Sequence, residues 1–350
     1  MPSYLLFATE RYALPILQPL ADALLATGHG VHALLVDGAA GATLSGGVQA
    51  VDVARAVALK PRAVFSAANW VPPFLGGAKV QLFHGFNVEK RDDARGHFRV
   101  RGLFDLYCTQ GPLTTAPFRK LARQQGHFAV VETGWPKLDP LFGPEDAVAQ
   151  DFRARAGGRP IVMFASTFTE RLSAAPHLHE AIAAQIAAGD RYWLLTLHPK
   201  CAPGLFQRYR ALAGDNALFF ETEQLVSAQR AADVLLADTT SVVSEFAVQR
   251  KPVVTFRNRA PKPHMLDFDR PSWLPVMLDR AFAADEALQL AIASYADGIH
   301  PWRDGQSSQR VIAATEDLIA GRLGALRPKP RNWLRHLQIR RELGYWGRAG

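Results

Sequence analysis

The chain has 350 residues, of which 48% are hydrophobic and 21% are charged, and it contains two cysteines. This length suggests about two domains, and the composition excludes a disordered chain, a collagen-like repeat and a small disulfide-stapled fold. The formal net charge of +8 is concentrated at the C-terminal end, where residues 322–348 hold eight basic side chains and one acidic one. A nucleic-acid-binding protein spreads its positive charge over a folded surface, so we expect no nucleic-acid partner.

Apolar stretches of strand length alternate with helical stretches through the first part of the chain. A strand–helix alternation with short turns is typical of a parallel sheet. We therefore expect residues 1–143 to form a Rossmann-like domain. Its strands are expected at 4–9, 31–36, 48–53, 63–66, 80–83, 106–109 and 128–132, and its helices at about 14–26 and 113–125.

The alternation restarts after a polar, alanine- and glycine-rich stretch at 143–159, which we interpret as a linker with one or two helical turns. A second Rossmann-like domain is expected over 158–321, followed by a basic, aromatic tail at 322–350. Ligands of such sheets bind beyond the carboxyl ends of the strands, so a cleft between the two domains is expected. The predicted strands are 161–165, 192–197, 218–220, 234–237 and 253–256, with helices near 177–188, 205–213, 223–230 and 242–249.

Several familiar ligand signatures are missing from the sequence. No Gly-x-Gly-x-x-Gly follows the first strand and no phosphate-binding Gly-x-x-x-x-Gly-Lys-Ser/Thr occurs, which argues against a dinucleotide dehydrogenase and a P-loop NTPase. The histidines show no metal-ligand spacing, so we expect neither a metal nor another cofactor. The beginning of the chain does not resemble a secretory signal and no apolar run could cross a bilayer. A cytoplasmic location is therefore expected.

A histidine follows one predicted strand in each half of the chain. The strand at 80–83 runs into His84 and Gly85, and the strand at 192–197 runs into His198 and Pro199. Imidazole titrates near neutral pH and suits general-base work on an alcohol, and glycine lets a ligand approach closely. One histidine could deprotonate an acceptor while the other stabilises a phosphate. The alternative is that each is hydrogen-bonded in an ordinary turn.

The strand at 234–237 ends in Asp238-Thr239-Thr240-Ser241, and a helix is predicted to begin directly behind it. Hydroxyl groups beside the free N–H groups of a helix N-terminus can hold a phosphate. Glu245, about one helical turn further on, is in position to accept ribose hydroxyls. The alternative is an ordinary helix cap with no ligand.

Two smaller features occur at other predicted turns. Gly134 and Pro136 follow the strand at 128–132 and are expected to point toward the cleft. Ser307 and Arg310 lie at a loop and helix start where they could clamp an anion. Both features could equally be a structural turn and a helix cap.

The tail mixes basic residues with tryptophan and leucine, a combination that suits an anionic membrane surface. Its apolar positions do not gather on one face of a helix, so the amphipathic signal is weak. The tail could instead be a helix packed on the body with its arginines in water. Its large apolar residues are Trp333, Leu334, Leu337, Ile339, Leu343, Tyr345 and Trp346.

In their order along the chain, these motifs resemble the CDP-glycerol:poly(glycerophosphate) glycerophosphotransferases, the family of teichoic-acid primases and polymerases. The resemblance spans about 80–315 and is most specific over 232–256. The matching residues are His84-Gly85-Phe86 with Lys90, Gly134 to Asp139, Ser166-Thr167-Phe168, Leu197-His198-Pro199, Asp238 to Ser241, and Gly305 to Arg310.

The resemblance implies a GT-B fold and transfer of a glycerol phosphate, or a related polyol phosphate, from a CDP-linked donor with release of CMP. It implies that His84 is the catalytic base and that His198 contacts the donor diphosphate. Acceptors would be hydroxyl-bearing polymers or lipid-linked molecules in teichoic-acid-like or capsule polysaccharide synthesis at the inner face of the membrane. The implied binding residues are Gly85, Lys90, Gly134, Pro136, Thr167, Asp238, Thr239, Thr240, Ser241, Glu245, Ser307 and Arg310.

Three other functions stay open. A GT-B glycosyltransferase would share the phosphate site but transfer a sugar and release a nucleoside diphosphate. A nucleotide-sugar 2-epimerase pairs two such domains, although it would be expected to have a cleft rich in carboxylates. A non-catalytic nucleotide-binding protein of an assembly complex belongs to a different class, and the intact hydroxyl triplet argues against it.

Overall fold

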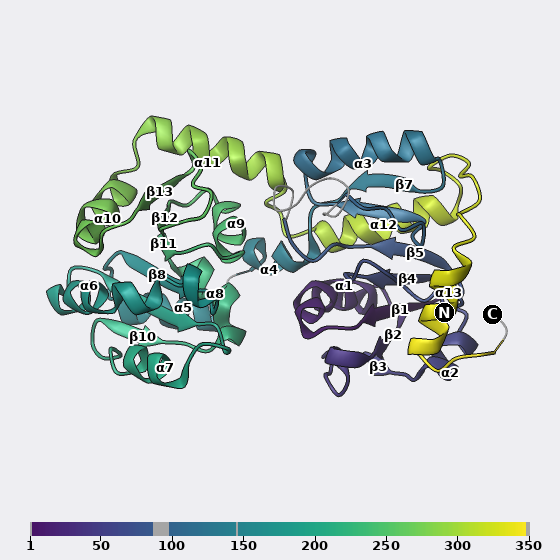
Figure 1. Ribbon diagram of the computed structural model, residues 1–350, viewed down its shortest axis with the longest axis horizontal. Coiled ribbons are helices and arrows are strands. Elements are labelled where there is room, and N and C mark those ends of the chain that lie inside the picture. Colours follow the sequence, from purple (N-terminus) through teal and green to yellow (C-terminus); the bar gives the residue numbers. More distant parts are fainter. Residues whose placement is uncertain (1, 87–97, 145, 348–350) are drawn as a thin grey trace. The chain divides into compact units, whose positions relative to one another are not determined.

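The computed structural model describes residues 2–86, 98–144 and 146–347 (Figure 1). The chain divides into two compact units, one comprising Met1–Phe142 with Ile299–Gly350 and the other Gly143–Gly298. Each unit is built on one sheet of parallel strands with helices on both faces. The expected α/β class with two doubly wound sheets is therefore confirmed.

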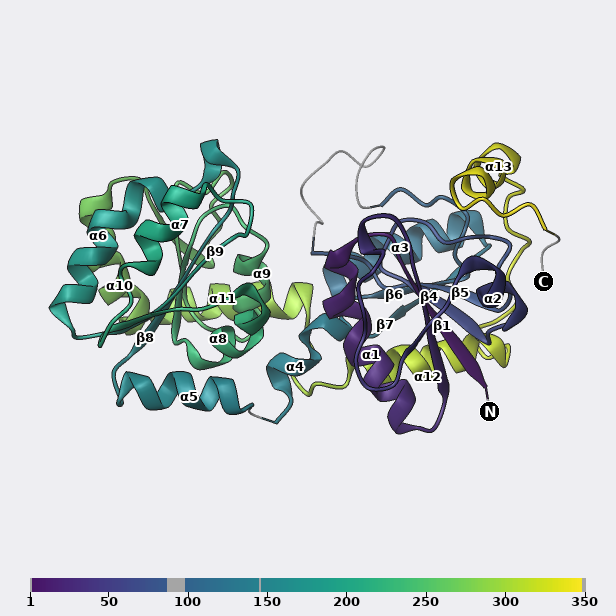
Figure 2. The same ribbon diagram turned by 90° about the horizontal axis from the view of Figure 1, so that it is seen from below.

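The first unit contains a seven-stranded sheet in the order β3-β2-β1-β4-β5-β6-β7. Helices α1 and α12 cover one face, while α2, α3 and α13 lie on the other (Figure 2). Its strands are β1 (Ser3–Ala8), β2 (Gly30–Leu35), β3 (Gln49–Ala50), β4 (Ala63–Ser66), β5 (Ala78–Gln81), β6 (Leu106–Thr109) and β7 (Ala129–Glu132). Its helices are α1 (Leu14–Ala26), α2 (Val53–Ala58), α3 (Pro112–Gln125), α4 (Asp139–Phe142), α12 (Ser307–Ile319) and α13 (Trp333–Glu342).

The second unit contains a six-stranded sheet in the order β10-β9-β8-β11-β12-β13. Helices α6, α7 and α10 pack on one face, and α5, α8, α9 and α11 pack on the other. Its strands are β8 (Ile161–Ser166), β9 (Tyr192–Leu197), β10 (Ala217–Phe219), β11 (Val234–Ala237), β12 (Val253–Phe256) and β13 (Met265–Phe268). Its helices are α5 (Ala147–Ala156), α6 (Ala175–Ala188), α7 (Pro203–Arg210), α8 (Leu225–Ala231), α9 (Val242–Ala247), α10 (Leu274–Ala283) and α11 (Glu286–Ile299).

The two faces of the second sheet bury alternate residues of the same strands. In β8, Val162 and Phe164 pack against α6 and α10, whereas Ile161 and Met163 pack against α5 and α8. Successive strand residues point to opposite faces, and a parallel sheet covered on both faces needs apolar residues at every position. This explains why the strands appear in the sequence as continuous apolar runs without alternation.

The unit boundaries differ from the expected domains 1–143 and 158–321, because residues 299–321 belong to the first unit. Helix α12 packs against α1 and the first sheet, and the Tyr4 hydroxyl donates a 2.6 Å hydrogen bond to Glu316. The tail at 322–350 also belongs to this unit. The expected linker at 143–159 contains a regular helix, α5, whose N-cap Asp146 accepts a hydrogen bond from the Ala149 N–H.

Within the described part of the chain, no helix is both long and apolar enough to cross a membrane.

Short 3-10 turns also connect the elements of both units. They occur at Arg11–Ala13, Asp37–Ala39, Pro136–Leu138, Glu170–Leu172, Thr222–Gln224 and Pro271–Trp273.

Candidate functional site

The carboxyl ends of four neighbouring strands, β9, β8, β11 and β12, meet at one edge of the second sheet. The predicted polar motifs of this unit all follow these strands, so the fold brings them to the same edge. Thr167 follows β8, His198 follows β9, and Asp238 with its hydroxyl triplet follows β11. This edge is the donor-side candidate site.

Asp238 is fully buried and its carboxylate is directed toward the end of β8. It accepts hydrogen bonds from the Ser166 hydroxyl at 2.6 Å, from the Thr167 N–H at 3.1 Å and from the Ala174 N–H at 2.9 Å. Burial raises the pKa of Asp238, and these hydrogen bonds oppose that rise. Asp238 therefore fixes the loop between β8 and α6 beside β11. Its predicted contact with substrate stays a prediction.

The three hydroxyl residues after Asp238 differ in their partners. The Thr239 hydroxyl accepts a 2.9 Å hydrogen bond from the Arg259 N–H, which ties the loop after β12 to the edge. Thr240 is half-buried and Ser241 is exposed, and neither hydroxyl has a hydrogen-bond partner among the described residues. Helix α9 begins immediately after Ser241 and is six residues long. Two free hydroxyls therefore stand where the sequence predicts a phosphate.

Glu245 lies in α9 and is 5% exposed. Its carboxyl group is within the unit's packed interior rather than on an open surface. Its predicted contact with ribose hydroxyls stays a prediction.

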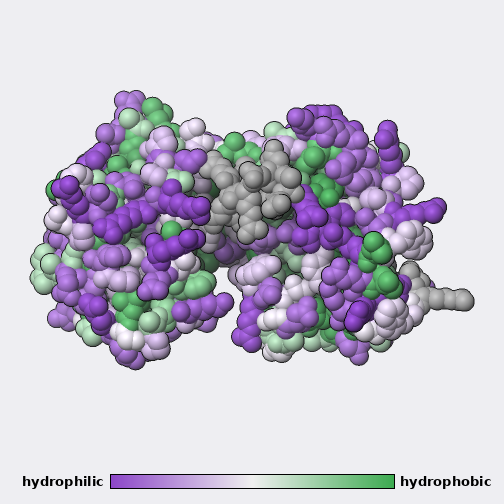
Figure 3. Space-filling view, viewed as in Figure 1, coloured by the Kyte–Doolittle hydropathy of each residue, from purple (hydrophilic) through white to green (hydrophobic). Residues whose placement is uncertain are grey.

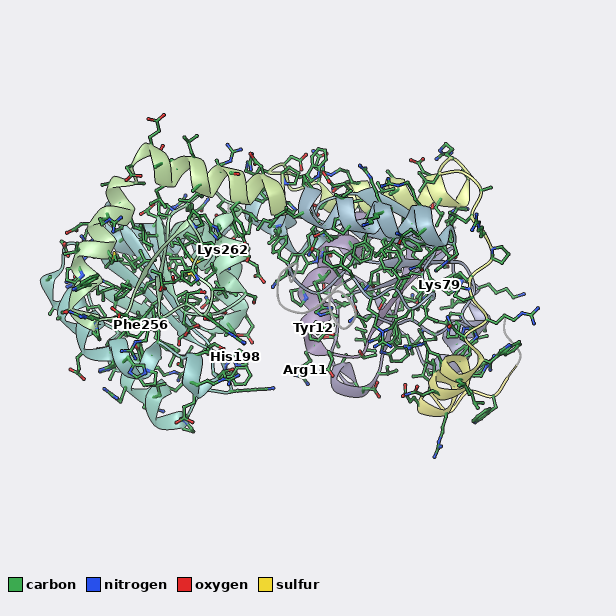
Figure 4. The ribbon with its side chains drawn as sticks, turned by 45° about the horizontal axis from the view of Figure 1, so that its top comes forward. Arg11, Tyr12, Lys79, His198, Phe256 and Lys262 are labelled. Atoms are coloured by element: carbon green, nitrogen blue, oxygen red, sulfur yellow. The ribbon has the colours of Figure 1, made fainter. Side chains whose placement is uncertain are left out.

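His198 lies exposed at the end of β9 (Figure 4). Its Nδ1 accepts a 3.1 Å hydrogen bond from the Lys200 N–H, and its ring lies 4.4 Å from that of Phe168. Because Nδ1 accepts, the neutral ring carries its proton on Nε2. Partial burial and the Lys200 charge lower the pKa of His198. The side chain is thus a neutral donor, suited to a phosphate oxygen.

His84 follows β5 in the first unit, and the turn that holds it is strained. Phe83 is buried and has a φ of +59°, a conformation that costs a bulky residue about 1–2 kcal/mol. Such strain concentrates at functional sites. On the other side of the histidine, the Gly85 carbonyl accepts a 3.2 Å hydrogen bond from the buried amide of Gln110. The strand end therefore holds His84 in one position.

The hydrogen bonding of His84 is the reverse of that of His198. Its Nδ1 lies 3.3 Å from the Ala67 carbonyl oxygen, which can only accept, so Nδ1 carries the proton. The Nε2 lone pair is then available to take a proton from a ligand. Burial lowers the pKa of His84, opposed by the hydrogen bond to Ala67, so the ring is unprotonated at neutral pH. The Tyr12 ring, in the turn after β1, has its centroid 5.4 Å from that of the His84 ring; Tyr12 is labelled in Figure 4.

The structure brings together Gly134, Pro136, Ser307 and Arg310 in the first unit, where each has partners within the chain. Asp139 accepts hydrogen bonds from the Ser307 and Ser308 N–H groups at 2.7 and 2.8 Å, so the chain's own carboxylate occupies the start of α12. A Cβ on Gly134 would lie 2.5 Å from the Ser307 hydroxyl.

Arg310 is equally occupied within the first unit. It donates to the Thr133 carbonyl at 2.9 Å and pairs with Asp304 at 2.8 Å. The observed contacts join the returning chain to the end of β7. The predicted contacts of this cluster with a donor stay predictions, and the predicted residue Lys90 lies outside the described residues.

The sequence analysis missed several polar groups at these edges. Gln81 and Gln110 are buried at the ends of β5 and β6, and their Oε1 atoms have no hydrogen-bond partner within the described ranges. A polar residue ending a buried strand was the available signal for both. The strain at Phe83 has no counterpart in the sequence.

The chain is similar to known proteins in sequence and in structure. The model of the CDP-glycerol:poly(glycerophosphate) glycerophosphotransferase family matches residues 88–260. A variant of the wall teichoic acid polymerase TagF has 14% identity and a TM-score of 0.68, covering 92% of this chain and 90% of that chain. A variant of the same polymerase soaked with CDPG has 12% identity, a TM-score of 0.66 and the same coverage.

A putative UDP-N-acetylglucosamine 2-epimerase from Listeria monocytogenes is also similar in structure. It has 12% identity and a TM-score of 0.64, and the match covers 93% of this chain and 98% of that chain. No curated protein sequence matches the chain. The structural likenesses confirm the expected GT-B fold. The family match over residues 88–260 confirms the expected resemblance to the CDP-glycerol:poly(glycerophosphate) glycerophosphotransferase family.

Proposed function

We propose that the chain transfers glycerol phosphate, or a related polyol phosphate, from a CDP-linked donor to an acceptor hydroxyl and releases CMP. The observation that carries this proposal is the opposite hydrogen bonding of two imidazoles that follow strands in the two sheets. His84 offers a lone pair on Nε2, whereas His198 offers an N–H. One can accept the proton of an alcohol, and the other can donate to a phosphate oxygen.

In this mechanism the acceptor hydroxyl gives its proton to Nε2 of His84, and its oxygen attacks the β-phosphorus of the donor. The bond between that phosphorus and the bridging oxygen breaks, and CMP leaves with the electron pair. Positioning and charge stabilisation provide most of the rate enhancement in phosphoryl transfer. His198 and the free hydroxyls of Thr240 and Ser241 would stabilise the negative oxygens of the donor.

The strained turn at Phe83 supports the role of His84. A general base must hold its acceptor atom within hydrogen-bond reach of the reacting hydroxyl, and a ring fixed by Ala67 and a rigid turn loses little freedom on binding. Lowering the pKa of His84 by burial keeps the base form populated at neutral pH. These features are consistent with a base and are not needed by a purely structural histidine.

The acceptor belongs to the same proposal. We expect a hydroxyl-bearing polymer or lipid-linked molecule of the cell envelope, in teichoic-acid-like or capsule polysaccharide synthesis. Such an acceptor would be met in the cytoplasm at the inner face of the membrane, with the basic tail as the contacting segment. Metals and other cofactors have no part in the proposed step.

The test is to incubate the chain with CDP-glycerol, other CDP-polyols and UDP-sugars and to identify the released nucleotide. CMP together with a phosphate-bearing product is expected. Release of a nucleoside diphosphate with sugar transfer would instead identify a GT-B glycosyltransferase. Epimerised nucleotide sugar would identify a 2-epimerase, the candidate favoured by the likeness to the Listeria protein. Binding without any product would identify a non-catalytic nucleotide-binding protein.

A further inference from the structure

Helix α13 carries apolar residues on two opposite faces. Ile339 is buried in the core beneath α13, and Leu343 packs partly against the same core. Trp333, Leu334 and Leu337 are 71%, 86% and 54% exposed. At about 100° per residue these three fall within one arc of about 100°, facing away from Ile339. In Figure 3 hydrophobic side chains lie exposed among hydrophilic ones over α13.

The exposed face has no structural use within the first unit. The helix is already anchored by Ile339, by stacking of Tyr345 on Phe74 at 4.7 Å and by the Asn332 side chain, which donates to the Arg101 carbonyl at 3.0 Å. Trp346 is a further large apolar side chain, 64% exposed, just beyond the helix. Single exposed apolar residues are normal on a protein surface, whereas a cluster of them marks an interaction site. The exposed tryptophan and leucine side chains of α13 form such a cluster.

A pocket of about 580 Å³ lies beside the start of α13. Among the residues that line it are Leu103, Lys329, Arg331, Trp333 and His336. Lys329 pairs with Asp105 at 2.8 Å. The guanidinium group of Arg331 has no acidic partner in the part of the chain that the structure describes. The pocket therefore combines an aromatic wall with uncompensated positive charge.

The positive charge extends from the pocket onto the neighbouring body of the unit. Burial, followed by the nearby charges of Arg335 and Arg99, lowers the pKa of Arg101. The Arg101 Nε is buried without a hydrogen-bond partner among the described residues. Burial and the charges of Arg340 and Lys329 likewise lower the pKa of His336. Like charges held this close are unfavourable unless an anion lies among them.

We propose that α13 docks on a membrane surface rich in anionic phospholipid, with Trp333, Leu334 and Leu337 entering the interface. The pocket of Lys329 and Arg331 would take a lipid phosphate. Tryptophan suits the level of the headgroups, and basic residues near an anionic surface add attraction. A soluble polyanion would use the charges but would leave the exposed apolar face unused. This inference rests on the proposed location at the membrane. It identifies α13 as the segment and anionic phospholipid as the lipid that hold the protein there.

The test measures co-sedimentation of the full chain with vesicles of phosphatidylcholine alone and with about one third phosphatidylglycerol, in the absence of donor and acceptor. Binding is expected only with phosphatidylglycerol. The charge variant Arg331→Gln/Arg335→Gln should weaken it by roughly 25-fold, about fivefold for each cation. The apolar variant Trp333→Ser/Leu337→Ser should weaken it at least about tenfold. Arg331, Trp333 and Leu337 are exposed and Arg335 is half-buried, so thermal unfolding should change little.

Matched controls come from the second unit. Leu290 is 63% exposed, and Leu290→Ser removes an exposed apolar residue away from α13. Arg280 is also exposed, and Arg280→Gln removes one charge. Neither control should change vesicle binding.

Equal binding of the wild type to both vesicles, or wild-type binding by both α13 variants, would overturn the proposal. Loss in the charge variant alone would also overturn it, because it would indicate a soluble polyanion as the partner. Because no donor is present, a negative result leaves the proposed transfer reaction unaffected. Conversely, absence of CMP release would not remove vesicle binding.

Discussion

The strand-end histidines of the two units occupy comparable positions but are held by different means. His84 follows a strained turn and donates from Nδ1 to the Ala67 carbonyl. His198 is exposed, and its Nδ1 accepts from a backbone N–H two residues on. In each case the main chain bonds Nδ1 and thereby decides whether the outward Nε2 of the neutral ring carries the proton. One fold element, a parallel strand running into a histidine, can therefore supply a base or a donor depending on the local backbone.

The supports beneath the two edges differ as well. In the second unit a buried carboxylate, Asp238, gathers hydrogen bonds from the loop after β8. In the first unit the returning chain before α12 packs against Gly134, and Asp139 fixes the start of that helix. Both edges therefore use a buried carboxylate, and the first edge adds close packing at Gly134. Substitutions can separate these two supports.

The largest effect is expected from replacing the histidines themselves. His84→Ala should lower kcat for CMP release by roughly 10²–10⁴-fold, the usual contribution of a general base, with little change in donor affinity. His198→Ala should mainly raise the KM for the CDP donor, by about tenfold or more, because a hydrogen bond to a charged phosphate is lost. Steady-state kinetics with each variant measure this division.

His29→Ala serves as the control, because His29 lies between α1 and β2, away from the carboxyl edge of the first sheet. Its kinetics should match the wild type. If His84→Ala keeps full turnover, the base assignment is wrong. If the two site variants show the same change in kcat and KM, the contrast between the two histidines is lost.

The next effect concerns the backbone support of the first unit. Gly134 has a φ of +79°, and an added Cβ would meet the Ser307 hydroxyl at 2.5 Å. Gly134→Ala should destabilise this unit by about 2–4 kcal/mol, from the backbone conformation together with overpacking. Gly28 has nearly the same φ, +78°, but nothing within 4 Å of its Cβ position. Gly28→Ala should therefore cost about 1 kcal/mol, and urea unfolding of both variants compares them.

The difference in unfolding free energy between these two glycine variants measures the close approach of Ser307, the first residue of α12, to Gly134. Equal destabilisation would mean that Ser307 moves aside without cost and that the packing is not a support. The double variant Gly134→Ala/Ser307→Gly gives a second measurement, because it removes the contact but keeps the backbone cost. It should recover most of the difference between the two single variants.

The charged support of the second unit is tested by Asp238→Asn. The amide keeps the size of the side chain but replaces one acceptor oxygen with an NH₂ donor. The N–H groups of Thr167 and Ala174 need acceptors, so a donor placed opposite them is unfavourable. The expected loss is about 2–3 kcal/mol of unfolding free energy. Ser166→Ala removes the hydroxyl and keeps both backbone N–H partners, so about 1 kcal/mol is expected. If Asp238→Asn leaves the unfolding free energy unchanged, the carboxylate is not a support.

The sequence predicts the strand ends well because each buried strand appears as a continuous apolar run that stops at a polar residue. His198 and Asp238 directly follow β9 and β11 as expected, and helix α1 has the predicted bounds. The strand before His84 ends at Gln81, two residues earlier than predicted. The direction of the Asp238 carboxylate was not predictable, because it depends on β8 lying next to β11, which are separated by three α-helices and two strands along the chain. Strand order is set by packing, which periodicity does not contain.

The C-terminal region was less predictable for a related reason. Helix α12 packs on the first sheet although it follows the second in sequence. The alternation of strands and helices does not specify which sheet a helix covers. In α13 two apolar faces cancel in any measure of amphipathicity, so the helix gave a weak signal. Only the buried Ile339 shows which face belongs to the core.

The smallest expected effect is a change in the pH dependence of kcat/KM. It shows whether His84 or His198 is the group that titrates. Burial lowers the pKa of His84, so the base form persists below the ordinary value of about 6.5. We expect kcat/KM to rise with pH through this lowered pKa and then to stay level. Tyr12→Ala removes part of the cover over His84, so the acid limb should move up toward the ordinary value, with unchanged activity at alkaline pH. Phe168→Ala, beside His198, should leave the acid limb in place. A limb that moves with Phe168 rather than Tyr12 would assign the titration, and with it the base, to His198.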